Sequence, residues 1–141
     1  MTTTFALLCQ LGGLSQREAA TFLKVRPDTV KSWSAGRNRT PPGVIATLAE
    51  LAERIDAAAD EAVEEIEQRM EVAGAAPGVI ELGLAGDDRE AQSLGWPCIG
   101  THRAVIALTA ARALNLLAFE GHATRVEIVP RGSTPATRPM V

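Results

Sequence analysis

The chain has 141 residues, enough for one ordinary domain or for a small module followed by a second element of similar bulk. Hydrophobic residues make up 46%, charged residues 22% and aromatic residues 4%, a globular composition that argues against a disordered chain and against a base-stacking platform. The net charge of −3 is unevenly spread, because residues 1–41 carry six Lys or Arg against two Asp or Glu. This basic segment keeps nucleic acid open as a partner despite the acidic total.

No part of the sequence predicts secretion or a membrane span. The apolar stretch near the N-terminus has no basic flank ahead of it, and no run approaches twenty uninterrupted apolar residues. Cys9 and Cys98 lie in apolar stretches without a second Cys or His at metal-ligand spacing, which favours buried thiols. These features predict a cytoplasmic protein without a membrane partner, a metal or a cofactor.

Two short helices are predicted at the start of the basic segment. The first contains the apolar residues Phe5, Ala6, Leu7, Leu8 and Leu11 and ends at the pair Gly12-Gly13, since glycine tolerates the conformations that close a helix. Ser15 then begins the second helix as an N-cap, and Glu18 three residues later completes a capping box.

A third helix is predicted after a short break. Pro27 suits the first turn of a helix, and Gly36 lies where a left-handed C-cap would end it. The pattern of the second and third helices is carried by Ser15, Gln16, Glu18, Ala19, Ala20, Leu23, Val25, Thr29, Val30, Trp33 and Gly36, followed by Pro41, Leu48 and Ala49. This pattern resembles the helix-turn-helix of lambda-repressor-like regulators of the Cro, C1 and Xre type, over roughly residues 4–52.

The resemblance implies DNA binding. In such domains the third helix enters the major groove, while the start of the second helix touches the DNA backbone. Carried over position by position, the family places Val30 and Trp33 in the core. The residues that it implies for DNA contact are Gln16, Arg26, Pro27, Asp28, Lys31, Ser32, Arg37 and Arg39.

The resemblance also implies distinct roles for these residues. Asp28 would accept a hydrogen bond from the cytosine amino group, and Lys31 would donate to guanine acceptors. Arg37 and Arg39 would neutralise phosphates, and Gln16 would contact one. For Asp28 an alternative stays open, because its charge also supports the start of the helix.

Two positions depart from the family pattern, and some cations have a simpler interpretation. Lys24 stands where the family usually has Gly, and Ser34 stands where it usually has Glu. Neither departure removes a core position. Taken singly, Lys24, Arg37 and Arg39 fit an ordinary solvated face; only their placement around the two helices favours DNA contact.

One long acidic helix is predicted over residues 42–73. Apolar residues recur there at spacings of three and four, and nine Asp or Glu stand against two Arg. Spacings of four outnumber those of three, which favours packing against the chain's own elements or a twin subunit over a long coiled coil. The carboxylates are interpreted as a solvated face.

The C-terminal part predicts a small αβ module over residues 77–130. Residues 79–84 and 124–130 have the pattern of strands, and residues 87–94 that of a short helix. Thr101 is expected to cap a longer helix that reaches Phe119. The sequence does not decide whether the two strands pair within one subunit or across a dimer axis.

The longer helix predicts a homodimer. It is apolar on nearly every face and needs burial all round, whereas two strands and one other long helix offer limited cover. We therefore expect dimerisation through residues 44–130, and a flexible tail over residues 131–141. His102 and His122 flank this helix too far apart to share a metal, so capping or solvent exposure is expected for them.

The fold class expected from these elements is mainly α, with an N-terminal helix-turn-helix bundle over residues 1–52, the long helix and the αβ dimerisation module. No phosphate loop, nucleophile elbow or zinc-protease helix is present, so no enzyme is expected. The leading hypothesis is a dimeric transcriptional repressor of bacterial or phage type on an inverted repeat. The alternatives are an antitoxin-like module that binds a protein partner, and a ligand-sensing regulator.

Overall fold

A computed structural model describes residues 2–122 and 124–132. The elements in chain order are α1 (Thr4–Leu11), α2 (Gln16–Leu23), α3 (Pro27–Ala35), α4 (Pro42–Ala73), β1 (Val79–Leu84), α5 (Asp88–Ser93), α6 (Ile99–Phe119) and β2 (Arg125–Pro130). The described part is mainly helical with one small sheet, which confirms the mixed class with helix predominating. From residue 133 on, the predicted tail lies outside the described residues. No helix in the described ranges combines the length and apolar character needed to cross a bilayer.

The chain divides into two compact units that alternate along the sequence. The first contains the residues up to Ile55 together with Asp87–Ala104, and the second contains Asp56–Gly86 and the described residues from Val105 on. The sequence-based division differs, since it places residues 87–104 in the C-terminal module. The physical reason is the start of α6, where Thr101 is fully buried and its hydroxyl donates to the carbonyl of Gly12 at 2.8 Å.

Two expectations for the start of α6 are therefore wrong. Thr101 does not cap the helix, because α6 already begins at Ile99. His102 is neither a cap nor solvent-exposed; its side chain is fully buried. His122 is different, because it is exposed and pairs with Glu120. The start of α6 is thus a buried part of the first unit.

The core of the first unit gathers around α3. Val30 is fully buried and Trp33 is 8% exposed, which confirms both predicted core positions. The rings of Phe5 and Trp33 meet edge to face, with centroids 5.4 Å apart, a favoured geometry for aromatic pairs. Leu48 of α4 is also buried. Apolar contacts therefore fix the orientation of α3 in its unit.

Local hydrogen bonds and backbone conformations define the ends of α2 and α3. The amide of Ser15 donates to Glu18 Oε1 (3.0 Å) and the amide of Glu18 donates to Ser15 Oγ (3.1 Å), so the predicted capping box is confirmed. Gly36 ends α3 in the left-handed conformation, also as predicted. Lys24 ends α2 in the same conformation, with φ of 57°. A residue with a Cβ is strained there, which explains why glycine suits this position.

Lys24→Gly is expected to stabilise the fold. Glycine adopts positive φ without the steric cost that a Cβ brings, so the free energy of unfolding should exceed that of Lys24→Ala by about 1 kcal/mol. Both variants remove the same charge, and their comparison isolates the backbone term. Urea denaturation measures it, and equal stabilities of the two variants would contradict a strained turn.

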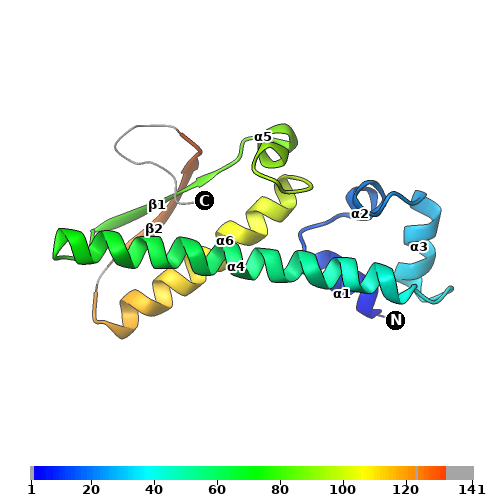
Figure 1. The fold of residues 1–141 in the computed structure, drawn as a ribbon, viewed down its shortest axis with the longest axis horizontal. Helices are drawn as coiled ribbons and strands as arrows, with labels where there is room; N and C mark the ends of the chain where they lie inside the picture. The colour runs from blue at the N-terminus through cyan, green and yellow to red at the C-terminus, as the bar shows by residue number, and fades with distance from the viewer. Residues whose placement is uncertain (1, 123, 133–141) are drawn as a thin grey trace. The chain divides into compact units, whose positions relative to one another are not determined.

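The second unit contains a two-stranded parallel sheet. β1 and β2 run side by side, with Ile80 opposite Val126 and Leu82 opposite Ile128 (Figure 1). The strands therefore pair within one chain, which resolves the question that the sequence leaves open. The core beneath them consists of Ile66, Ile80, Leu82, Ile106, Ala113 and Leu117. Arg112 of α6 also connects α6 to α4 in this unit, because it forms ion pairs with Asp56 and Asp60.

Candidate nucleic-acid interface

Helix α3 has a buried face and an exposed face. Val30 and Trp33 are three residues apart and point into the core. Asp28 and Lys31 have the same spacing on another face and are exposed, and Ser32 beside them is half-buried. The helical period thus leaves a polar face of α3 open to a partner.

The start of α3 is also open. Arg26 is the N-cap residue in extended conformation, and its side chain makes no capping hydrogen bond. Pro27 takes the first helical position, as predicted, and both side chains are exposed. Asp28 lies in the first turn, where its charge meets the positive end of the helix dipole. This placement suits both interpretations of Asp28.

A hydrogen bond that the sequence does not predict ties α3 to the loop that follows it. Asn38 Nδ2 donates to Ser32 Oγ at 2.7 Å. The bond leaves the hydroxyl proton of Ser32 available to a partner. It also anchors the loop that carries the exposed residues Arg37 and Arg39. Asn38 is thus a positioning residue of the candidate site; the only signal in the sequence was a polar loop after Gly36.

The start of α2 lies beside α3. Gln16, the first residue of α2, lines the same pocket of about 480 Å³ as Val30 and Ser34 of α3. Gln16 is exposed. The predicted site residues therefore come from three adjoining segments, namely the start of α2, the outer face of α3 and the loop after it (Figure 1).

The charge of the segment before α4 is predominantly positive. The exposed cations of the segment before α4 are Arg17, Lys24, Arg26, Lys31, Arg37 and Arg39. Against them stand Asp28 and Glu18, and the Glu18 carboxylate is engaged in the capping box. Such a basic segment attracts polyanions even though the whole chain is acidic.

Glu18 is held in its ionised form. Burial alone would raise the pKa of its carboxyl, but the hydrogen bonds from the backbone and hydroxyl of Ser15 act in the opposite direction. The thiol of Cys98 and the positive charge of Arg103 add to them, and the net result is a pKa below the usual 4.5. The start of α2 is thus tied electrostatically to the segment that opens α6, within the same unit.

Acid should weaken the first unit through Glu18. Because the pKa is lowered on folding, its contribution to stability is present above the unfolded value of 4.5 and is lost as the pH falls through the folded value. Glu18→Gln should therefore flatten the stability profile between about pH 5 and pH 3. Urea titrations across this range measure the effect, with Glu50→Gln on the exposed side of α4 as control. An unchanged profile for Glu18→Gln would refute it.

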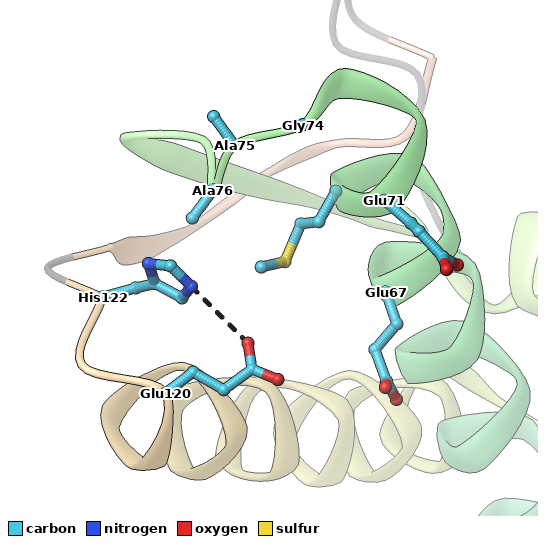
Figure 2. Close-up of a pocket in the computed structure, with 8 residues that line it drawn as sticks. Glu67, Glu71, Gly74, Ala75, Ala76, Glu120 and His122 are labelled. Carbon is cyan, nitrogen blue, oxygen red and sulfur yellow. Dashed lines mark ion pairs between the residues drawn. The ribbon is translucent and has the colours of Figure 1, made fainter.

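The second unit holds a separate pocket of about 480 Å³ (Figure 2). It is lined by the ends of α4 and α6 and by the turns that follow them, including Glu67, Glu71, Glu120 and His122. Figure 2 shows His122 turned towards Glu120, and Nε2 of the imidazole lies 3.5 Å from Oε2 of the carboxylate. Within the described residues, no three His, Cys, Asp or Glu side chains are grouped to hold a metal ion.

Comparison of the chain with protein-family models and with curated proteins gives no match. The functional interpretation therefore depends on the chemistry of the residues themselves. The feature most informative about function is the exposed, polar and basic face around α3. The opposite face of this helix packs into the core of the first unit.

Proposed function

We propose that the protein is a sequence-specific DNA-binding regulator that represses transcription as a homodimer on an inverted-repeat operator. The observation that carries this proposal is the division of α3 into a core face with Val30 and Trp33 and an outer face with Asp28, Lys31 and Ser32. An α-helix fits the major groove of B-DNA, where polar side chains distinguish base pairs by their donors and acceptors.

Each outer residue has a chemical role in this proposal. Lys31 donates to the O6 and N7 acceptors of guanine, and Asp28 accepts from the amino group of cytosine. Ser32, held by Asn38, uses its hydroxyl proton towards a base or a phosphate. Arg26 and Pro27 place the start of α3 against the groove. Together these groups read bases by direct contact.

The flanking segments provide the sequence-independent part of the affinity. Arg37 and Arg39 on the loop after α3 neutralise phosphates and release counterions. Gln16 and the first amides of α2 contact a phosphate, because the start of a helix favours negative charge. These contacts set the position of α3 on the duplex and do not read sequence.

Repression then follows from occupancy of the operator. A homodimer presents two copies of α3 related by a two-fold axis, and such an arrangement matches half-sites about one helical turn apart. A protein bound there excludes RNA polymerase sterically. The mechanism requires no chemical reaction and no cofactor.

Selection of binding sites from a random duplex library tests the proposal. We expect enrichment of one inverted repeat whose half-sites are separated by about one helical turn. Mobility shifts with the enriched duplex and with a scrambled duplex then measure the preference. Failure to enrich any sequence, together with a stable complex with another protein of the same cell, would replace the proposal with the antitoxin-like alternative.

A further inference from the structure

The small sheet of the second unit has an open edge at β2. β1 pairs with one edge of β2, and no other described strand pairs with the opposite edge (Figure 1). Two-stranded sheets are marginal by themselves, and parallel sheets are normally extended or covered. Ile128 of β2 is 50% exposed although it stands opposite the fully buried Leu82. Among the described residues, no strand therefore pairs with the outer edge of β2.

The hydrogen bonds of β2 show which of its main-chain groups face outward. The amides of Arg125 and Arg131 donate to the carbonyls of Gly78 and Leu84, so these odd-numbered residues point towards β1. Successive residues of a strand direct their main-chain groups to opposite sides. Val126 and Ile128 therefore present both N–H and C=O groups at the open edge. Pro130 also falls there, and it has no N–H to donate.

The charges along β2 are self-complementary around Val126. Arg125 and Glu127 flank it, and their side chains form an ion pair of 2.9 Å on the face away from the core. If a second β2 lies antiparallel with a two-fold axis at Val126, Arg125 stands opposite the partner subunit's Glu127. The reverse contact forms by symmetry, and opposite charges on facing strands stabilise a sheet.

Neighbouring registers are less favourable. A two-fold axis at Arg125 or at Glu127 would place like charges directly opposite each other, which is destabilising. An axis at Ile128 would place Arg125 opposite the partner subunit's Arg131. It would also pair Val126 with the partner subunit's Pro130, which cannot donate a hydrogen bond. Charge and main-chain pattern therefore select the same register.

We infer that two copies of the chain join edge to edge through β2, antiparallel, with the two-fold axis at Val126. Val126 exchanges both main-chain hydrogen bonds with its counterpart, and Ile128 pairs with the partner subunit's Thr124. The result is a continuous sheet of four strands with the order β1, β2, β2, β1. This inference deepens the proposed function, since it specifies how the homodimer expected on an inverted repeat is built.

A charge-swap experiment tests the interface directly. Arg125→Glu gives a chain with two acidic residues around Val126, and Glu127→Arg gives a chain with two basic ones. For each variant alone, the dissociation constant of the dimer should rise at least about tenfold, because both cross-strand contacts become repulsive. An equimolar mixture should form heterodimers with near wild-type affinity. If Arg125 and Glu127 interacted only within one chain, mixing the two variants would not restore dimerisation.

A second exposed ion pair of the same unit provides the control. Arg69 and Glu65 on α4 are 3.1 Å apart, and Arg69→Glu should leave dimerisation unchanged. Sedimentation velocity and native mass spectrometry of the full chain, without DNA, measure the masses. Single variants that dimerise like the wild type, or a mixture that stays monomeric, would overturn the inference.

These mass measurements, taken together with the selection of binding sites from a random duplex library, separate this inference from the proposed function. A chain that dimerises and responds to the charge swap, but prefers no duplex sequence, contradicts the regulator alone. A chain that is monomeric at all concentrations yet binds a preferred half-site contradicts the β2 interface and the homodimer, but leaves sequence-specific DNA binding in place.

Discussion

Gly13→Ala is expected to lower the free energy of unfolding of the first unit by at least about 3 kcal/mol. Gly13 has φ of 70°, a conformation in which a Cβ is strained. A Cβ there would also overlap the carbonyl of Gly100 and lie 2.8 Å from the amide nitrogen of Thr101. Both obstacles are main-chain atoms, which cannot rotate away as a side chain can. The substitution should therefore separate the turn before α2 from the start of α6.

Gly74→Ala is the matched control. Gly74 has φ of 73°, but a Cβ there meets nothing within 4 Å. At Gly74 only the backbone strain remains, so the free energy of unfolding is expected to fall by about 1 kcal/mol. Chemical denaturation of both variants measures the difference. Equal losses at the two glycines would show that the close approach of Gly13 to Gly100 contributes nothing.

Lys31→Ala is expected to lower the preference for operator over scrambled duplex by about tenfold to a hundredfold. Lys31 lies on the outer face of α3 and is exposed, so its removal leaves no cavity and should not affect folding. The loss should appear at one base pair of each half-site, because a single donor contact is removed. Titrations with duplexes altered at each position in turn measure this effect.

Arg39→Ala is the matched control for this prediction. It removes a cation of the same charge from the loop after α3. Binding should weaken to a similar extent for operator and scrambled duplex, and the salt dependence should decrease by about one unit of slope. If both variants lose preference equally, or if neither does, the proposed division between base and phosphate contacts is wrong.

Local patterns predict most of the elements correctly. The capping box at Ser15, the C-cap at Gly36 and the bounds of β1 depend on a few neighbouring residues, so the sequence contains the information directly. The buried positions Val30 and Trp33 are expected from the resemblance to lambda-repressor-like domains, and the helical period explains why both lie on one face of α3.

Contacts between distant segments are not predictable in this way. Thr101 has the pattern of a helix cap, yet it is fully buried. Its hydroxyl donates a hydrogen bond to the carbonyl of Gly12, 89 positions away in the chain. His102 follows it into the core. The bond from Asn38 to Ser32 spans a loop whose path has no periodicity. The sequence does not predict the pocket beside His122, because its lining comes from the ends of α4 and α6, which are far apart in the chain.

The resemblance to lambda-repressor-like domains supplies the list of proposed DNA-contact residues, and the packing of α3 explains why those on its outer face are exposed. Lys24 stands where that family usually has Gly. Its left-handed backbone conformation is strained for a residue with a Cβ, which lowers the stability of the turn. Asp28 keeps two compatible roles, because an exposed carboxylate in the first turn both stabilises the helix and faces outward.

A salt-varied binding titration tests the central proposal most directly. The purified full chain is titrated against the DNA upstream of its own coding sequence and against a scrambled duplex of equal length and composition. We expect preferential binding to the upstream DNA that weakens steeply with salt, and the slope of log affinity against log salt concentration should reflect the number of phosphates neutralised. Equal affinity for both duplexes, or no binding at low salt, would contradict a sequence-specific regulator.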